Sequence, residues 1–319
     1  MSDSFEVYAY CRLCPRNCAV NRFSAAGYCG ETGAMRIAWS GLHFGEEPPV
    51  SAVDGSGTVF FSGCNLGCVY CQNRQISRPQ APGTVFTVDE AAALFLRLQA
   101  AGAENINLVT GTPHLPSVIA ALRQAKSDGL SVPVVWNCSG YETIEAVDAL
   151  NEVIDIYLPD MKTADAANSR RYLRVPDYPE TAAAAIDRMC RAKPPVTVPL
   201  FNDRLGFEHP LMKQGVIIRH LALPGETADS LKVMHIYETR WRPLGALFSL
   251  ITDYLPSSDL TAPLDRRLTA SEADSLRRIF SEREWDDCFF QEPETDADDW
   301  RPDFTRKEPF PAGFSRRIL

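Results

Sequence analysis

Hydrophobic and polar positions along the chain follow two different periods from Thr58 onward. Short apolar runs bounded by turn residues predict strands, and longer amphipathic stretches predict helices. The predicted strands cover residues 58–61, 106–109, 132–136, 154–158, 196–200, 216–223 and 247–251. The predicted helices cover residues 91–101, 116–126, 143–150, 179–191, 227–237 and 269–281. Strands that alternate with helices of this length predict an α/β fold built on a parallel sheet or barrel.

Two of these helices begin with the pattern of a capping box. Thr87 stands three residues before Glu90, and Thr269 stands three residues before Glu272. In this arrangement the threonine and glutamate side chains each accept a hydrogen bond from a backbone amide that the helix leaves unpaired. The pattern therefore predicts where both helices start.

Three parts of the chain differ in composition. Residues 1–54 are rich in Cys, Gly, Pro and Arg and predict a small metal-stabilised lead-in. Residues 55–255 carry the alternating pattern of the core, and residues 256–319 hold the last helix and a tail. The tail contains four aromatic residues that predict packing onto the body: Trp300, Phe304, Phe310 and Phe314.

Charge and targeting signals narrow the class of protein. The formal net charge of the 319 residues is -9, whereas a free-standing nucleic-acid binder is usually basic, so no nucleic-acid partner is expected. The first residues contain no basic region followed by an apolar stretch, and no apolar run approaches the roughly 18–20 residues that cross a bilayer. We therefore expect a cytoplasmic protein without a membrane partner.

Three of the ten cysteines stand together in one loop directly after the predicted strand 58–61: Cys64, Cys68 and Cys71. Loops at the carboxyl ends of barrel strands are where active sites form. Three thiolates can hold three irons of a [4Fe–4S] cluster and leave the fourth open to a small molecule. The alternatives are a zinc site that borrows a fourth ligand, or plain buried thiols. Zinc sites favour two pairs of cysteines over one triplet.

A second group of four cysteines lies near the N-terminus, and it consists of Cys11, Cys14, Cys18 and Cys29. Clustered cysteines in a reducing compartment bind metal more often than they form disulfides. Four protein ligands close a metal site, so the group predicts a structural or electron-relay role for zinc or for a second iron–sulfur cluster. The alternative is a set of loose thiols.

The cysteine triplet, with Tyr70 before its last member, resembles the radical S-adenosylmethionine (SAM) superfamily. The Cys71-Gln72-Asn73 ending, with Ser62-Gly63 ahead of it, narrows the resemblance to relatives of pyruvate formate-lyase activating enzyme. Over nearly its whole length, the chain resembles an uncharacterised branch of these activase-like proteins. The stretches that carry this resemblance are residues 11–18, 43–48 and 217–225.

This resemblance implies a partial (β/α)6 barrel and an oxidoreductase. SAM would bind the open iron through its amino and carboxylate groups, and one electron from the reduced cluster would give methionine and a 5′-deoxyadenosyl radical. That radical would remove a hydrogen atom from a substrate. The resemblance to the activases implies that this substrate is a protein glycine. The implied electron donor is of the flavodoxin or ferredoxin type. The alternatives are another peptide or a small metabolite as substrate, or a non-catalytic iron–sulfur electron carrier.

The same resemblance implies which residues bind the cofactor, because they stand at strand ends that contact SAM in the family. Residues 110–113 stand where many relatives carry Gly-Gly-Glu, while residues 137–140 and 160–162 resemble Asn-Thr-Asn-Gly and Asp-Leu-Lys segments. The candidates are Tyr70, Thr110, Gly111, Thr112, Asn137, Ser139, Asp160, Lys162, His220 and Leu223.

Four further polar residues have a different interpretation. His114 is more often structural than functional beside such a strand end. Glu46 and Glu47 predict a solvated acidic turn ahead of the barrel rather than residues at its mouth. Arg219 lies inside an apolar strand, so it needs a charged partner or a cavity.

Overall fold

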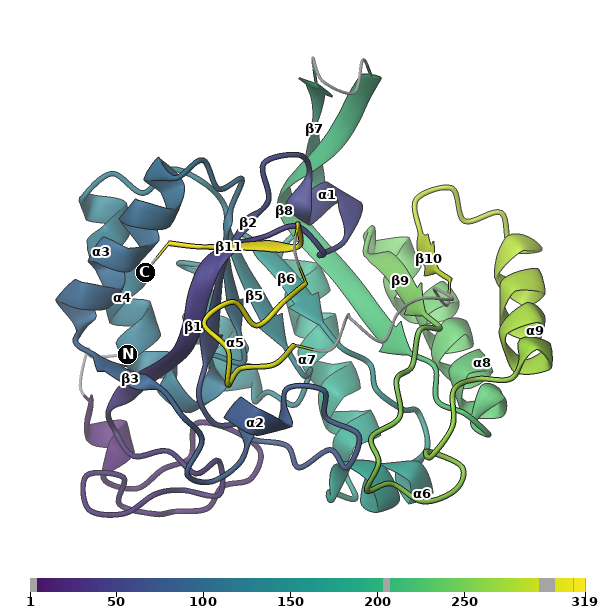
Figure 1. Cartoon of the computed structure of the whole chain (residues 1–319), viewed down its shortest axis with the longest axis horizontal. Helices are drawn as coiled ribbons and strands as arrows, with labels where there is room; N and C mark the ends of the chain where they lie inside the picture. Colours follow the sequence, from purple (N-terminus) through teal and green to yellow (C-terminus); the bar gives the residue numbers. More distant parts are fainter. Residues whose placement is uncertain (1–4, 203–206, 293–301, 312, 319) are drawn as a thin grey trace.

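The computed structural model describes residues 5–202, 207–292, 302–311 and 313–318 (Figure 1). The strands are, in chain order, β1 (Met35–His43), β2 (Ser56–Phe61), β3 (Thr84–Phe86), β4 (Ile106–Val109), β5 (Val134–Cys138), β6 (Ile156–Pro159), β7 (Val196–Asn202), β8 (Phe207–Leu221), β9 (Leu247–Ile251), β10 (Phe289–Gln291) and β11 (Ser315–Arg317). The α-helices are α1 (Pro48–Ser51), α2 (Arg74–Ser77), α3 (Val88–Ala100), α4 (Leu115–Ser127), α5 (Ile144–Leu150), α6 (Ala166–Asn168), α7 (Tyr178–Ala192), α8 (Thr227–Ile236) and α9 (Ala270–Ser281).

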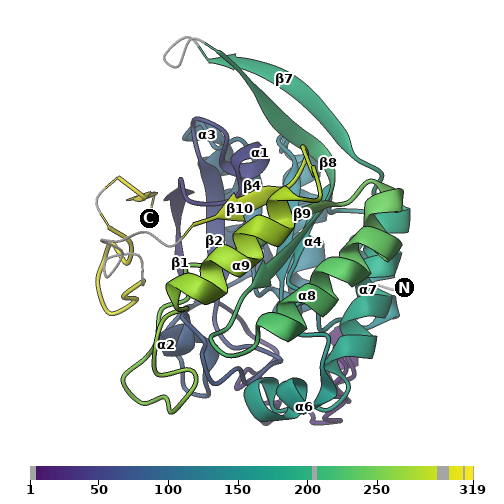
Figure 2. The same cartoon turned by 90° about the vertical axis from the view of Figure 1, so that its right-hand side faces the viewer.

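One sheet joins these strands in the order β10-β9-β8-β6-β5-β4-β2-β1-β11. The pairs from β2 through β4, β5, β6, β8 and β9 to β10 are parallel, whereas β1 is antiparallel to both β2 and β11. The sheet order does not close on itself. The predicted α/β fold is therefore confirmed as a partial barrel, and the helices cover its outer side (Figures 1 and 2).

Both predicted capping boxes are present. Thr87 and Glu90 exchange hydrogen bonds at the start of α3, and Thr269 and Glu272 do so at the start of α9. The predicted strand at 106–109 and the late strand at 247–251 match β4 and β9 to the residue. Local signals of this kind fix where an element starts because the capping partners lie within one helical turn.

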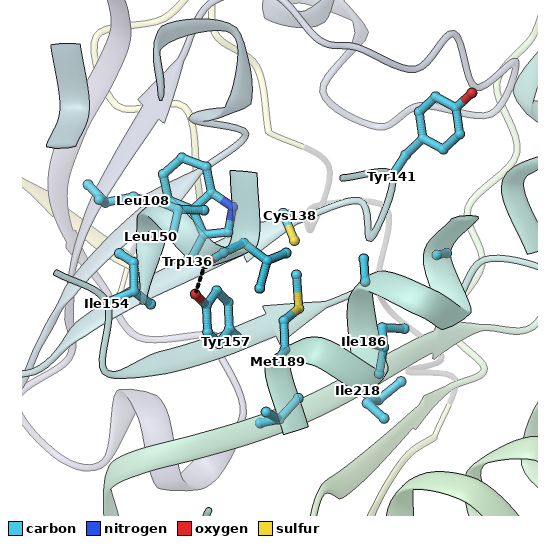
Figure 3. Packing of buried hydrophobic residues seen from close by; sticks show 14 of the residues in the cluster. Leu108, Trp136, Cys138, Tyr141, Leu150, Ile154, Tyr157, Ile186, Met189 and Ile218 are labelled. Atoms are coloured by element: carbon cyan, nitrogen blue, oxygen red, sulfur yellow. Dashed lines mark hydrogen bonds between the residues drawn. The ribbon is translucent and has the colours of Figure 1, made fainter. Parts of the chain in front are cut away.

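The main core lies between the sheet and its helices. In β5 and β6 the outward side chains are large and apolar, and Trp136 and Tyr157 are fully buried. Figure 3 shows this layer, which also contains Ile186 and Met189 of α7. Because side chains alternate along a strand, the neighbouring positions point into the barrel.

The inward positions change from apolar to polar toward the carboxyl ends of the strands. Val135, Ile156, Leu158 and Ile217 form a small apolar cluster inside the barrel. The next inward positions along these strands are polar, and they comprise Asn137, Asp160 and Arg219. The sequence thus builds an apolar floor with a polar layer above it, at the end where the cysteine loop lies.

Two parts of the sheet differ from the sequence-based expectation. Strand β1 belongs to the lead-in, where no strand was predicted, because Ser40 and Gly41 weaken its strand pattern. Gly41 is required there, since a Cβ atom would lie 2.6 Å from the carbonyl oxygen of Arg316. The strand predicted at 216–223 is the second half of the long β8, which forms an antiparallel hairpin with β7 that projects from the body (Figure 2).

The tail packs onto the body as predicted. Phe310 contacts the rings of Trp39 and Phe60, with centroids 5.4 and 5.6 Å apart, and Phe304 also packs on Phe60. Trp300 lies outside the described residues. In Figure 1 the yellow tail crosses the side of the sheet opposite the helices. None of the helices in the described part of the chain is long and apolar enough to cross a membrane.

Candidate functional site

The three clustered cysteines lie in the loop that follows β2. This loop starts at Gly63, whose φ is 79° and whose Cβ would lie 2.7 Å from the Cys29 carbonyl oxygen. Only glycine fits this conformation and this close approach. Cys64, Cys68 and Cys71 all line one cavity of about 300 Å³.

The three thiols are close enough to influence one another. Burial raises the pKa of Cys64, and negative charge on Cys68 or Cys71 raises it further. Burial also raises the pKa of Cys68 to about 11, although the nearby Lys162 ammonium opposes the shift. Cys64 and Cys68 are therefore protonated at neutral pH, and a metal that binds them as thiolates has to release their protons.

The polar layer beneath the cysteines is a network of charges around Arg219. The Arg219 guanidinium lies 3.1 Å from Asp160 Oδ1 and 3.4 Å from Glu46 Oε2, and it donates to Asn137 Oδ1 at 2.5 Å. Asn107 donates to the other Glu46 oxygen at 2.7 Å. Glu46, Asn137, Asp160 and Arg219 all line the same cavity.

Lys162 adds a second positive charge to this layer. Its Nζ atom lies 2.6 Å from Asp160 Oδ2. Although burial opposes ionisation of Asp160, the charges of Lys162 and Arg219 lower its pKa. Burial opposes the charge of Lys162 in turn, but Asp160 and other acidic groups raise its pKa overall. The cavity floor therefore presents fixed charges of both signs.

The segment after β4 contains a strained residue. Thr110 has φ 61°, which is an outlier for a β-branched residue, and it lines the cavity. Gly111 follows with no room for a side chain, because its Cβ would lie 2.6 Å from the Trp136 ring. Thr112 turns away from the cavity and donates to Glu142 Oε1 at 2.5 Å. Burial raises the pKa of Glu142 to about 8.

The structure brings most of the residues predicted to hold the cluster and SAM to one cavity. Those that line it are Cys64, Cys68, Cys71, Thr110, Asn137, Ser139, Asp160 and Lys162. Five predicted cofactor contacts do not line it, namely Tyr70, Gly111, Thr112, His220 and Leu223. Of these, Tyr70 is buried against Tyr172 and Tyr254. His220 uses both ring nitrogens within the protein, toward Met161 O at 2.7 Å and Ser230 Oγ at 2.9 Å.

The interpretation of Glu46 and Glu47 as a solvated acidic turn is wrong. Glu47 is buried, and the Glu46 side chain reaches the interior of the barrel, where it is only 8% exposed. The reason is Arg219, which needed a partner inside its apolar strand and finds it in Glu46. The unpartnered charge in that strand was the only signal in the sequence for this pair.

Sequence reasoning also missed the part of the tail that closes the cavity. Phe310 and Phe314 line it, together with His43. The Phe314 carbonyl oxygen lies 3.0 Å from His43 Nδ1 and accepts from the Phe44 amide at 2.9 Å. The aromatic residues of the tail predicted packing onto the body, but nothing in their spacing indicated which surface they cover.

The four N-terminal cysteines also gather in one place. A Cβ on Gly27 would lie 3.5 Å from the sulfur atoms of both Cys18 and Cys29. Burial raises the pKa of Cys14 to about 12, and negative charge on the nearby Glu142, Cys29 and Cys11 contributes to this rise. In neither cysteine group, nor elsewhere in residues 5–202, 207–292, 302–311 and 313–318, do three or more Cys, His, Asp or Glu side chains already form a metal-holding set.

Comparisons with known proteins identify the family. The radical SAM superfamily matches residues 58–235, which is more than half of the chain. These residues include the cysteine loop and the strand ends that line the cavity. The chain therefore belongs to the radical SAM superfamily, as its motifs predicted.

An uncharacterised protein of Methanocaldococcus jannaschii is 30% identical over 228 residues, which cover 69% of this chain and 58% of that protein. The chain thus spans little more than half the length of this curated relative. Streptococcus suis SuiB bound to the precursor peptide SuiA aligns with a TM-score of 0.47 and 8% identity, over 72% of this chain and 46% of SuiB. A domain of pyruvate-formate lyase-activating enzyme from Bacteroides vulgatus gives a TM-score of 0.38 and 15% identity, over 56% and 92% of the two chains.

Family membership implies a [4Fe–4S] cluster and bound SAM, and the cavity fits both. The three thiols are the donor set that iron–sulfur clusters use in proteins. The charges of Asp160, Lys162, Glu46 and Arg219 suit a ligand that carries both an ammonium and a carboxylate group. Both kinds of binding group line the same cavity, so cluster and SAM would lie next to each other.

Proposed function

We propose that this chain removes a hydrogen atom from a protein glycine by radical SAM chemistry, with Cys64, Cys68 and Cys71 as the cluster ligands. When bound, the cluster and SAM supply a 5′-deoxyadenosyl radical through one-electron cleavage. The observation that carries the proposal is that the three thiols share one cavity with the charged layer around Arg219.

The residues of the chain have three tasks in this proposal. Asp160 and Lys162 orient the amino and carboxylate groups of SAM, because charge-assisted hydrogen bonds fix direction as well as energy. Asn137, Ser139 and Thr110 line the same cavity, where they would contact the nucleoside. Phe310 and Phe314 line the cavity and would exclude water from it, which protects a reactive radical from side reactions.

The glycine substrate rests on the resemblance to activating enzymes. This resemblance has a limit, because no cysteine lies between Gln72 and Thr110, where many activases carry ferredoxin-like cysteines. A small metabolite is the second candidate.

The first test is SAM cleavage itself. The protein is reconstituted with iron and sulfide without oxygen and then given dithionite and SAM, and 5′-deoxyadenosine is followed by mass spectrometry. We expect product from the wild type and from Cys190→Ala, since Cys190 is a buried thiol in α7 outside both cysteine groups. Cys68→Ala should fold but give no product.

Two results would contradict the proposal at different points. Product from Cys68→Ala would defeat the assignment of the ligands. No product from wild-type protein with a reduced cluster, seen by electron paramagnetic resonance, would favour the non-catalytic electron carrier.

A second test addresses the substrate. An extract of cells grown on deuterated glycine is separated into macromolecules and small molecules, and each fraction is added to the reaction. Transfer of deuterium into 5′-deoxyadenosine from the macromolecular fraction supports a protein glycine. Transfer from the small-molecule fraction alone would replace it with a metabolite.

A further inference from the structure

The four N-terminal cysteines lie in the loops drawn in purple at the lower end of the molecule in Figure 1. Residues 9–34 are all described by the structure, and they contain no helix or strand. Short segments of this kind commonly depend on a metal ion or a disulfide for their stability. All four cysteines are free thiols, which leaves metal binding as the cross-link open to this segment.

The fold of these loops brings three of the sulfur atoms together. The amide and the carbonyl of Cys11 both bond to the segment 19–20, at 3.1 and 3.0 Å. The side chains of Cys11 and Cys18 are also hydrogen-bonded to each other. On the other side, a Cβ on Gly27 would lie 3.5 Å from the sulfur atoms of both Cys18 and Cys29. Cys18 is therefore a close neighbour of two further thiols.

Backbone amides point at the sulfur atoms of the group. The amides two residues after Cys14, Cys18 and Cys29 each hydrogen-bond to the sulfur of that cysteine. A hydrogen bond to a charged acceptor is about twice as strong as one to a neutral acceptor, so these amides favour thiolate over thiol. The thiolate is the form of cysteine that binds a metal.

The chain is strained on both sides of Cys18. The φ angle is 43° at Asn17 and 56° at Ala19, and each such conformation costs a non-glycine residue about 1–3 kcal/mol. Strain of this kind persists where the surrounding structure fixes the backbone, and it clusters at binding sites. A ligand shared by Cys18 and the neighbouring thiols accounts for it.

A buried positive charge lies beside the group. Arg22 is 1% exposed, its guanidinium donates to three backbone carbonyls at 2.5, 2.6 and 3.1 Å, and it stacks on the Tyr8 ring. Among the described residues Arg22 forms no ion pair, and the nearby Glu31 carboxylate pairs with Arg36 at 3.1 Å. The charge of Arg22 acts directly on Cys29. Because buried charges in proteins are paired, this site calls for negative charge from the thiols.

We propose that Cys11, Cys14, Cys18 and Cys29 bind one zinc ion as four thiolates. The spacing of the first three, Cys-x2-Cys-x3-Cys, falls within the range of structural zinc sites. Around a single zinc ion the sulfur atoms lie about 3.8 Å apart, since Zn–S bonds of about 2.3 Å meet at tetrahedral angles. Hydrogen-bonded thiols match this separation. An iron–sulfur cluster places each cysteine on a separate iron atom and so holds the sulfur atoms farther apart.

Zinc binding involves no redox step. Each protonated thiol that binds loses its proton to solvent and forms one Zn–S bond. Neither cysteine group forms a ligating set within the described residues, so the four side chains have to turn toward a common centre. Four protein ligands leave no open position, which makes the site structural and independent of the proposed function.

The test uses a full chain that lacks the catalytic ligands, Cys64→Ala/Cys68→Ala/Cys71→Ala, so that metal at the triplet does not contribute. This triple variant is purified without added metal and passed through a weak chelator. Zinc, iron and acid-labile sulfide are then measured per chain. The test variant adds Cys29→Ser, and the matched control adds Cys190→Ser, which changes a buried thiol in α7 outside both groups.

We expect about one zinc ion per chain in the triple variant and in the control, and about a tenfold loss in the test variant. Iron with acid-labile sulfide in place of zinc would overturn the proposal in favour of a second cluster. Four thiols that react with an alkylating reagent, with no metal bound, would overturn it in favour of loose thiols. Equal zinc in the test variant and the control would place the ion elsewhere.

Cobalt exchange gives a second readout, which does not require Cys29→Ser to fold. Zinc in the triple variant is replaced by Co²⁺, whose visible absorption reports tetrahedral coordination by thiolates. We expect this spectrum, and its loss when zinc is added back, because zinc binds such sites more tightly than cobalt does. A chain that takes up cobalt without a tetrahedral thiolate spectrum would contradict the four-cysteine site.

Discussion

The amide of Cys64 donates a hydrogen bond of 3.4 Å to the carbonyl of Cys29, so the two cysteine groups are joined backbone to backbone. Arg16, which lies between Cys14 and Cys18, adds a second link by donating to the Asn65 carbonyl at 2.8 Å. The predicted second metal site therefore lies directly against the loop of the catalytic cluster. Metal binding stabilises a local fold, so it would also stabilise this loop.

The first prediction concerns this connection. Cys18→Ala should lose the metal of the N-terminal group and also lower iron incorporation at the cysteine triplet, because the neighbouring loop is less ordered. Iron and zinc per chain are measured by mass spectrometry of the metals, and loop order by hydrogen exchange of residues 62–72.

Arg16→Gln is the matched variant for this prediction, because it cuts the link to Asn65 without removing a thiol. It should keep the N-terminal metal and still expose the catalytic loop to exchange. Full iron at the triplet in Cys18→Ala, with unchanged exchange, would show that the two groups are independent.

The second prediction concerns the charge network. Arg219→Met leaves Glu46 and Asp160 without their shared cation, and breaking a buried ion pair in this way costs about 3–5 kcal/mol. Adding Glu46→Gln to this variant should recover part of the loss, because one unpaired charge is then removed. Urea denaturation of both single variants and the double variant measures this coupling. Additive losses would mean that Glu46 and Arg219 do not interact.

Interactions between residues close together in the sequence were predictable, whereas interactions between distant residues were missed. The capping boxes at Thr87 and Thr269 need partners only three residues away, and they were found. The pair of Glu46 and Arg219 joins residues 173 positions apart, so it exists only once the sheet has formed. Sequence pattern could show that Arg219 needed a partner, but it could not identify one.

The residues predicted to bind the cofactor also differ in how far their position could be derived from the sequence. Asp160 and Lys162 follow directly after β6, and parallel strand ends meet at one edge of a sheet, so their place in the cavity was predictable. His220 lies beside Arg219 on β8, and which of the two points inward depends on strand register. A shift of one residue exchanges the two faces of a strand, and in this register Arg219 lines the cavity whereas His220 does not.

The third prediction concerns the strained segment after β4. Gly111→Ala would place a Cβ 2.6 Å from the fully buried ring of Trp136, and overpacking of this kind costs about 1–3 kcal/mol. Because Thr110 precedes it and lines the cavity, SAM should also bind more weakly. Gly33→Ala is the control, since its Cβ would meet Tyr8 at an ordinary 3.4 Å. Equal stability and SAM affinity in the two variants would contradict the close packing at Gly111.

The last prediction concerns acid stability. His114 is completely buried, and burial together with the charge of Arg22 lowers its pKa to about 3. An unfolded histidine titrates near about 6.5. As pH falls from about 6.5 toward 3, His114 is protonated in the unfolded chain but stays neutral in the folded chain. The free energy of unfolding therefore falls by about 1.4 kcal/mol per pH unit. Above this window the contribution of neutral His114 to the free energy of unfolding is fully present.

Urea denaturation between about pH 7.5 and 5.5 tests this prediction. The free energy of unfolding should decline less steeply with falling pH for His114→Gln than for the wild type. His235→Gln, at an exposed position on α8, should keep the wild-type slope. Identical slopes for all three proteins would mean that His114 accepts a proton in the folded state.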